Sequence, residues 1–230
     1  MLMKKIFTLI AMAVMAMNAN AQQIAFTEED VAAKGSLDGK VFEAGSFKLT
    51  ITDTDGKIEI DKNAQYFGTA ESQVKSAGGR LKSGGKSSSK NFMTASIPAA
   101  GTLKVWARTG SNSATDRNLV ITQGETELYN KVVQEADAVK VVGLDETDPT
   151  KETNVYPVIS VEVAAGDVVI TYPVGSMNFY GFEFAEGGAT AIENVKVQTA
   201  DGVVYNLAGQ KVSGDFKGIV IKNGKKMLQK

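Results

Sequence analysis

Short segments in which apolar and polar residues alternate run along much of the chain. Residues 47–52 and 57–61 have this pattern, and the turn-forming sequence Asp-Thr-Asp-Gly at 53–56 lies between them. Because successive side chains of a β-strand point to opposite faces, alternation indicates strands with one buried face. We therefore expect these two segments to pair as a β-hairpin. Five further segments alternate in the same way, namely residues 103–107, 119–121, 159–163, 168–172 and 180–184.

Helical patterns are short by comparison. The best one covers residues 27–34, with Thr27 placed to cap its first turn. Regularly spaced short strands without longer helices are typical of an all-β sandwich. After residue 184 the composition changes. Residues 187–199 are interpreted as a linker, and residues 200–230 as a small C-terminal β domain with hairpins of its own.

The first 21 residues have the features of a cleaved signal peptide. Lys4 and Lys5 precede an uncharged run at 6–17, and Ala19-Asn20-Ala21 supplies a small-x-small cleavage pattern. The run is shorter than the roughly 20 apolar residues that a membrane-spanning helix needs. The alternative is an N-terminal core helix. We expect an exported chain, secreted or displayed at the cell surface, with no membrane span after cleavage.

Composition narrows the possible functions. Without the two signal-peptide lysines, 23 of the 25 basic side chains remain against 26 acidic ones, a net charge of about −3. This balance argues against nucleic acid as a partner. The chain has no Cys, which excludes disulfides and thiolate metal sites, and no His, the commonest general base and zinc ligand. We therefore expect a protein that is not an enzyme, with no catalytic residues and no cofactor.

The end of the chain resembles a known sorting signal. Residues 204–212, followed by 217–221 and 223–226, are similar to the C-terminal tails of proteins exported by the Por (type IX) secretion system. The resemblance implies that the tail is recognised by secretion machinery and directs the protein to the surface or beyond.

A second resemblance covers residues 57–184. The segments that carry it are 80–85, 101–108, 114–119 and 178–182. They resemble β-sandwich modules found beside pectate lyases and other polysaccharide-degrading enzymes of anaerobic bacteria. The resemblance implies a jelly-roll or galactose-binding-like sandwich over residues 22–186 that binds carbohydrate without catalytic residues. Modules of this kind sometimes carry a structural calcium.

The segment at 102–109 offers a candidate binding face. Alternation places Lys104, Trp106 and Arg108 together, opposite the apolar residues. Trp106, the only tryptophan, could stack on a sugar ring while the cations bind hydroxyls or uronate carboxylates. The alternative is a Trp106 covered by the linker or the tail.

Three further cations extend the candidate site. In a strand, Arg80 and Lys82 would lie about 6.8 Å apart on one face, a spacing that suits an acidic glycan. Arg117 follows the Ser- and Asn-rich turn at 110–115, and could bind ligand or brace that loop through hydrogen bonds to backbone carbonyls.

Three other motifs have simpler explanations. Gly84-Gly85-Lys86-Ser87 lacks the first glycine of a phosphate-binding loop and is interpreted as a flexible loop. The acidic turn at 53–56 lacks the remaining ligands of a calcium loop and is expected to be a hairpin turn. The acidic residues at 145–148 fit a solvated loop, although they could also bind a cation.

The leading hypothesis is a non-catalytic glycan-binding module, with an acidic plant-type polysaccharide as a candidate ligand. Two alternatives stay open. One is a structural or adhesive surface protein without a glycan ligand. The other is a small polysaccharide lyase that uses a Lys or Tyr base.

Overall fold

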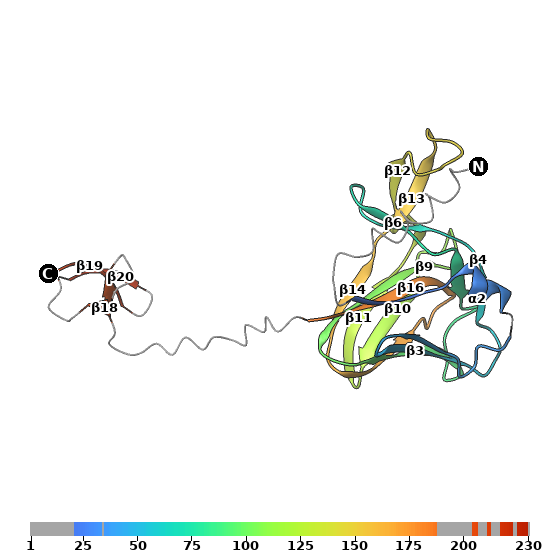
Figure 1. Cartoon of the computed structure of the whole chain (residues 1–230), viewed down its shortest axis with the longest axis horizontal. Coiled ribbons are helices and arrows are strands. Elements are labelled where there is room, and N and C mark those ends of the chain that lie inside the picture. Colours follow the sequence, from blue (N-terminus) through green and yellow to red (C-terminus); the bar gives the residue numbers. More distant parts are fainter. Residues whose placement is uncertain are drawn as a thin grey trace, which may run out of the picture. The chain divides into compact units, whose positions relative to one another are not determined.

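The computed structural model describes residues 21–33, 35–187, 204–206, 211–212, 217–222 and 225–229. The chain divides into two compact units, Met1–Gly187 and Gly188–Lys230. Figure 1 shows that strands dominate the first unit, as the alternating segments predict. Across the described ranges, no helix is long and apolar enough to cross a membrane.

The first unit is built around two six-stranded sheets. The first sheet has the order β14-β9-β16-β7-β4, and β1 also pairs with β16. Its strands are β1 (Ala21–Ala25), β4 (Glu59–Lys62), β7 (Gly79–Lys82), β9 (Gly101–Thr109), β14 (Ile159–Val163) and β16 (Met177–Glu186). The second sheet has the order β11-β10-β15-β8-β3-β2. Its strands are β2 (Val41–Ala44), β3 (Phe47–Asp53), β8 (Asn91–Ile97), β10 (Asn118–Gln123), β11 (Thr126–Val132) and β15 (Gly166–Thr171).

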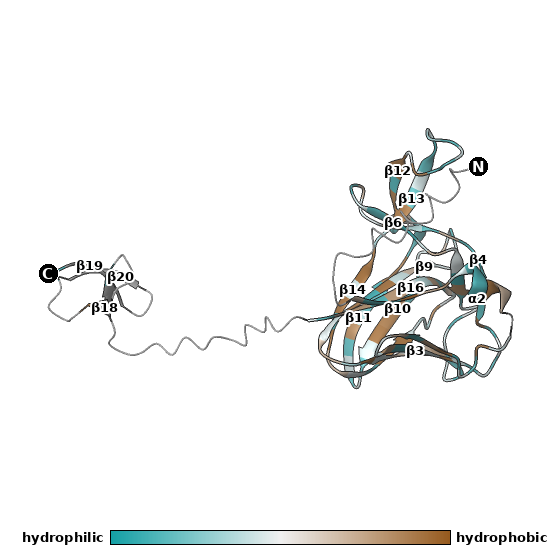
Figure 2. Ribbon diagram, in the orientation of Figure 1, coloured by the Kyte–Doolittle hydropathy of each residue, from teal (hydrophilic) through white to brown (hydrophobic). Residues whose placement is uncertain are grey.

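The hydrophobic core lies between these two sheets. Alternate residues of β3 and β8, such as Leu49 and Met93, share one buried cluster with Leu103, Val105 and Phe182 of the first sheet. The alternation appears in Figure 2 as brown and teal positions along the strands. The all-β sandwich expected from the sequence is therefore confirmed. Four of the five additional alternating segments lie within a strand, and the fifth, 168–172, extends one residue beyond the end of β15.

A third, small sheet lies on the outer face of the first sheet. It has the order β12-β13-β5-β6, in which β13 and β5 are parallel. Its strands are β5 (Tyr66–Gly68), β6 (Gln73–Lys75), β12 (Val139–Val142) and β13 (Glu152–Tyr156), and the 3-10 helix η1 (Glu135–Asp137) precedes β12. The alternation in the sequence did not predict this sheet, which joins two hairpins far apart in the chain (Figure 1).

The predicted hairpin at 47–61 is wrong in its pairing. Both strands exist, but β3 belongs to the second sheet and β4 to the first. The Asp53 carboxylate accepts hydrogen bonds from the backbone N–H of Lys57 (2.7 Å) and Ile58 (3.0 Å). These bonds, together with Gly56 at φ 63°, turn the chain away from β3 and across the sandwich edge.

The predicted helix forms, although it is shorter than expected. It is α2 (Glu28–Ala32), and Thr27 is its N-cap. The Asp30 carboxylate accepts from the Thr27 backbone N–H (2.7 Å), and Thr27 Oγ1 accepts from the Asp30 backbone N–H (3.4 Å). This reciprocal capping box fixes the start of the helix. The segment 84–87 lies in the loop between β7 and β8.

The second unit contains a four-stranded antiparallel sheet with the order β18-β17-β19-β20. Its strands are β17 (Val204–Asn206), β18 (Lys211–Val212), β19 (Gly218–Lys222) and β20 (Lys225–Gln229). β19 and β20 pair antiparallel, which confirms one of the hairpins predicted for residues 200–230. Residues 1–20 of the predicted signal peptide and residues 188–199 of the predicted linker lie outside the described residues. Ala21 pairs with Ala185 as the first residue of β1.

Candidate functional site

Trp106 does not form an open platform, so this part of the predicted site is wrong. Its side chain is buried, and its ring stacks on Phe67 of β5 with centroids 6.0 Å apart and an interplanar angle of 15°. Tyr156 and Tyr180 complete a second buried cluster around it. The small sheet therefore occupies the space in which a sugar would have to stack on Trp106. The alternative interpretation of the sequence, a Trp106 covered by the linker or the tail, is right about burial, but the small sheet forms the cover.

The predicted cations of the sheet face are paired with carboxylates of neighbouring strands. Arg80 donates from Nε to Asp61 Oδ1 (2.7 Å) and from Nη2 to the other oxygen, and this contact raises the pKa of Arg80. Lys82 Nζ lies 2.7 Å from Glu59. In the same way, Lys104 Nζ lies 2.7 Å from Glu183. The free cationic row expected for an acidic glycan is therefore absent from this face of the described sheet.

Arg117 supports a loop. Its Nη1 donates to the backbone carbonyl of Ser176 (3.1 Å) and to Ser176 Oγ (2.7 Å). Bracing was one of the two functions that the sequence left open for this residue, and the hydrogen bonds favour it.

Arg108 joins a polar network below the small sheet. Its Nη2 lies 3.1 Å from Glu135 Oε2, and its guanidinium carbon lies 5.0 Å from the centroid of the Tyr156 ring. Glu135 Oε1 accepts from Tyr156 Oη (2.7 Å) and from Asn154 Nδ2 (2.9 Å). Burial and the hydrogen bond to Glu135 raise the pKa of Tyr156 to about 12. The network links β9, η1 and β13.

This network forms one wall of a pocket of about 540 Å³, which we call the polar pocket. Almost all of its lining side chains carry a hydrogen-bonding or charged group. They are Gln65, Tyr66, Lys75, Arg108, Glu135, Asp145, Glu146, Thr147, Lys151, Glu152, Thr153, Asn154 and Tyr156, together with Leu144. Lysines and carboxylates at its entrance pair with each other, as in the 2.7 Å contact of Lys151 with Asp145.

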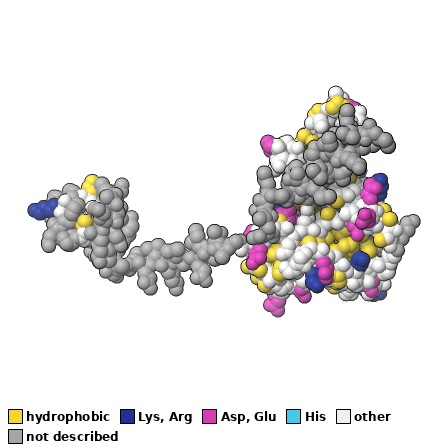
Figure 3. Space-filling model, in the orientation of Figure 1, with side chains coloured by type: hydrophobic (Ala, Val, Ile, Leu, Met, Phe, Trp, Pro, Cys, Tyr) yellow, Lys and Arg dark blue, Asp and Glu magenta, His cyan; other side chains and the backbone are white. Residues whose placement is uncertain are grey.

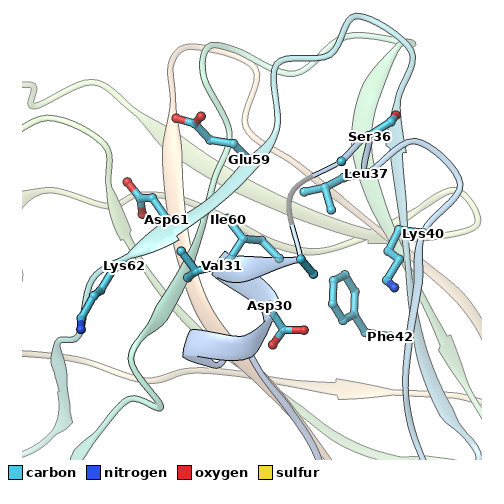
Figure 4. Close-up of a pocket in the computed structure, with 12 residues that line it drawn as sticks. Asp30, Val31, Ser36, Leu37, Lys40, Phe42, Glu59, Ile60, Asp61 and Lys62 are labelled. Carbon is cyan, nitrogen blue, oxygen red and sulfur yellow. The ribbon is translucent and has the colours of Figure 1, made fainter.

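A second pocket, of about 490 Å³, lies where the edge strands β4 and β2 of the two sheets diverge around α2. We call it the helix pocket (Figure 4). Its floor is apolar and its rim is charged. The floor includes Val31, Leu37, Phe42 and Ile60, and the rim includes Asp30, Lys40, Glu59, Asp61 and Lys62. Ala33, Gly35 and Ser36 also line the pocket. In Figure 3, hydrophobic side chains gather on this part of the surface beside acidic side chains and lysines.

Phe42 is the half-buried aromatic ring of the helix pocket. Its ring meets the buried Phe26 edge-to-face at a centroid distance of 5.3 Å, which fixes its orientation. Lys40 Nζ lies 5.7 Å from the centroid of the Phe42 ring. In Figure 4 the Phe42 ring lies between the side chains of Asp30 and Lys40. Aromatic surface and hydrogen-bonding groups therefore meet in one concave site.

The rim charges of the helix pocket are balanced. Glu59 and Asp61 pair with Lys82 and Arg80 as described, and Lys62 Nζ lies 2.8 Å from Glu28. The sequence pattern does not reveal this pocket, because residues 41–44 show no strict alternation and because Val31 and Phe42 come from separate elements. Arg80 and Lys82, which the sequence did single out, lie beside the pocket and orient its two carboxylates.

The acidic motifs serve local structure. Asp53 is buried and accepts backbone hydrogen bonds, while Asp145 accepts from Thr147 and Lys151, contacts that lower the pKa of Asp145. Across the described part of the chain, no group of three or more acidic side chains is placed to hold a metal ion. The loop at 143–151 is thus organised by its own hydrogen bonds.

No protein-family model matches the sequence, and the comparison with curated proteins found no match. A distant structural match is a chain studied for glycan recognition in the Ruminococcus flavefaciens cellulosome, 15% identical over 74% of this chain and 96% of that chain, with a TM-score of 0.36. The catalytic unit of a thermostable GH87 α-1,3-glucanase from Streptomyces thermodiastaticus is 14% identical over 62% of this chain and 26% of that chain, with a TM-score of 0.34. A GH87 α-1,3-glucanase catalytic domain in complex with nigerose is 9% identical over 62% and 28% of the two chains, with a TM-score of 0.32. The chain therefore spans little more than a quarter of either glucanase, and any assignment of a ligand rests on the pockets of this chain itself.

Proposed function

We propose that the first unit is a non-catalytic glycan-binding module and that its helix pocket holds a sugar. The observation that carries this proposal is the combination of an apolar floor around Phe42 with a charged rim in one pocket. A pyranose has an apolar face of C–H groups and an edge of hydroxyls. The floor removes the apolar face from water, while Asp30 and Lys40 can accept from and donate to the hydroxyls.

The charge balance favours a neutral glycan. A uronate carboxylate gains most from a cation that has no other partner, and Arg80, Lys82 and Lys62 are already paired. Lys40 has no carboxylate partner among the described residues, yet it faces the pocket together with Asp30. The acidic polysaccharide expected from the sequence is therefore replaced by neutral polysaccharide in this proposal.

Val31→Lys tests the site. A long cationic side chain on the pocket-facing side of α2 would occupy the space above Phe42, whereas Val31 itself is only half-buried. We expect wild-type protein to be retarded on a gel that contains its neutral polysaccharide, and the variant to lose this retardation. Val132→Lys is the matched control, since Val132 is 44% exposed on β11, at the opposite edge of its sheet from β2.

Two results would contradict the proposal. One is a glycan array, covering neutral and acidic polysaccharides, on which the wild-type chain binds nothing. The other is retention by Val31→Lys equal to that of Val132→Lys at the same thermal stability. Binding to acidic glycans alone would contradict the charge argument.

The lyase alternative has one observation in its favour, because Tyr66, Tyr156, Lys75, Lys151 and Arg108 all line the polar pocket. The raised pKa of Tyr156 opposes it, since a base must lose its proton near the working pH. Incubation with polygalacturonate checks this directly. Release of unsaturated products by wild type, lost in Tyr156→Phe, would support a lyase against our proposal.

We also propose that the chain is exported and sorted to the cell surface, on the strength of residues 1–21 and the tail motifs in the sequence. Mass spectrometry of the protein from its native host tests cleavage. The expected mature chain begins at Gln22, so that β1 keeps four of its residues, Gln22–Ala25, paired with β16. An uncleaved N-terminus would contradict the proposal.

A further inference from the structure

We infer that the helix pocket and the polar pocket are two subsites of one site, and that the ligand is an oligosaccharide segment long enough to contact both. This inference rests on the proposed function. It assigns the polar pocket a ligand and makes binding depend on the length of the glycan.

One continuous run of chain lines both pockets. Its first four residues, Glu59 to Lys62, belong to the helix pocket, while Gln65 and Tyr66 belong to the polar pocket. Three residue steps separate Lys62 from Gln65, a path of at most about 11 Å in extended chain. The run is held in place from below, since Tyr180 Oη donates to Asn63 Oδ1 (2.9 Å). The rim therefore passes from one pocket to the other on a fixed segment.

The register of the first sheet gives a second estimate of the span. Glu59 pairs with Lys82, Lys82 with Asn178, and Asn178 with Arg108, all in one row across four strands. Three strand spacings place Glu59 of the helix pocket about 14 Å from Arg108 of the polar pocket. A single sugar cannot reach across this distance, whereas an oligosaccharide can.

The polar pocket offers groups that suit sugar hydroxyls. Arg108 is nine-tenths buried, its Nη2 is engaged by Asn112 and Glu135, and its buried Nε has no hydrogen-bond partner among the described residues. Gln65 uses its Nε2 for Asn63, and no described residue donates to its Oε1. Thr153 lines the same pocket from β13. The Gln65 acceptor and the Thr153 hydroxyl thus remain for a neutral polyhydroxylated ligand.

The two pockets make different contributions to binding. The helix pocket covers apolar sugar surface, and the polar pocket adds hydrogen bonds that a short ligand cannot reach. A glycan that makes both contacts binds more tightly than either contact alone would allow, because once one pocket is occupied the second contact becomes intramolecular. We therefore expect affinity to rise steeply over the first few sugar units and then to level off.

Titration calorimetry of the full chain with a size series of the neutral glycan that it binds tests this inference. The polar-pocket variant is Gln65→Leu combined with Thr153→Val. We expect this variant to leave the affinity for the disaccharide unchanged and to lower the affinity for the longest oligosaccharide at least tenfold. Thr126→Val is the control, since Thr126 is exposed on β11 away from both pockets. Val31→Lys is expected to lower the affinity for ligands of every length.

The outcomes separate this inference from the proposed function. If the disaccharide and the long oligosaccharide bind equally well to wild type, or if the polar-pocket variant binds long ligands like wild type, the single extended site is refuted while the helix pocket stands. If the polar-pocket variant lowers the affinity for the disaccharide as much as that for the long ligand, the polar pocket is the primary site and the inference is also wrong. If no glycan binds at all, the proposed function itself fails.

Discussion

Glu135 is the residue whose removal should most weaken the attachment of the small sheet to the sandwich. Its carboxylate contacts Arg108 of β9 and accepts hydrogen bonds from Asn154 and Tyr156 of β13. Removing one partner of a fully buried ion pair costs about 3–5 kcal/mol, because the other charge stays buried without compensation. Here 25% of the Glu135 side chain and 11% of the Arg108 side chain are exposed, so part of this cost is relieved by water. We expect Glu135→Ala to lower the free energy of unfolding by about 2–4 kcal/mol.

Urea denaturation, followed by the fluorescence of Trp106, measures this loss. Glu135→Gln keeps an acceptor for Tyr156 and Asn154 but removes the charge, so it should cost about half as much as Glu135→Ala. Arg108→Met in the Glu135→Ala background removes the stranded charge and should recover at least about 1 kcal/mol, which a double-mutant cycle reports as coupling. A loss below about 0.5 kcal/mol in Glu135→Ala, or additive effects of the two substitutions, would refute the reasoning.

Two further predictions concern the aromatic cluster below the small sheet. Phe67→Ala removes the ring stacked on Trp106 and should cost about 3–5 kcal/mol while shifting the tryptophan emission to longer wavelength; unchanged emission would show that the small sheet does not cover Trp106. The pKa of Tyr156 is raised from its ordinary 10.0 to about 12 in the folded chain, so the folded state holds a proton that the unfolded state releases. The stability due to this group should be complete below pH 10 and fall as the pH rises from 10 to 12, and Tyr156→Phe should flatten that part of a pH series of urea midpoints.

The sequence predicts local structure better than pairing. Alternation identifies β3 and β4 correctly, and Thr27 identifies the start of α2, because these features depend on neighbouring residues. It does not show that the two strands enter different sheets, since that depends on how Asp53 uses its carboxylate. The correct strands and the wrong hairpin both follow from the alternation, because it shows which face of a strand is buried but not which strand it pairs with.

The candidate site shows the same division. Alternation correctly places Lys104, Trp106 and Arg108 on the outer face of the first sheet. It could not reveal that Phe67 and Tyr156, from two distant hairpins, would cover Trp106. The pairing of Lys82 with Glu59 likewise depends on the register between β4 and β7. Burial and neutralisation are tertiary properties, so a face of aromatic and cationic residues predicts a binding surface only when nothing else packs on it.

Covering that face has a consequence for where a ligand can bind. Once the small sheet occupies the centre of the outer face, open concave surface remains at its margins, where the polar pocket lies, and at the edge of the sandwich. The edge strands β4 and β2 expose unpaired backbone, and α2 lies between them as a partial cover. A five-residue helix covers this gap incompletely, and the uncovered part is the helix pocket. The shape of the proposed sugar site is therefore tied to the capping box that fixes α2, because Thr27 and Asp30 hold Val31 in place within the pocket floor.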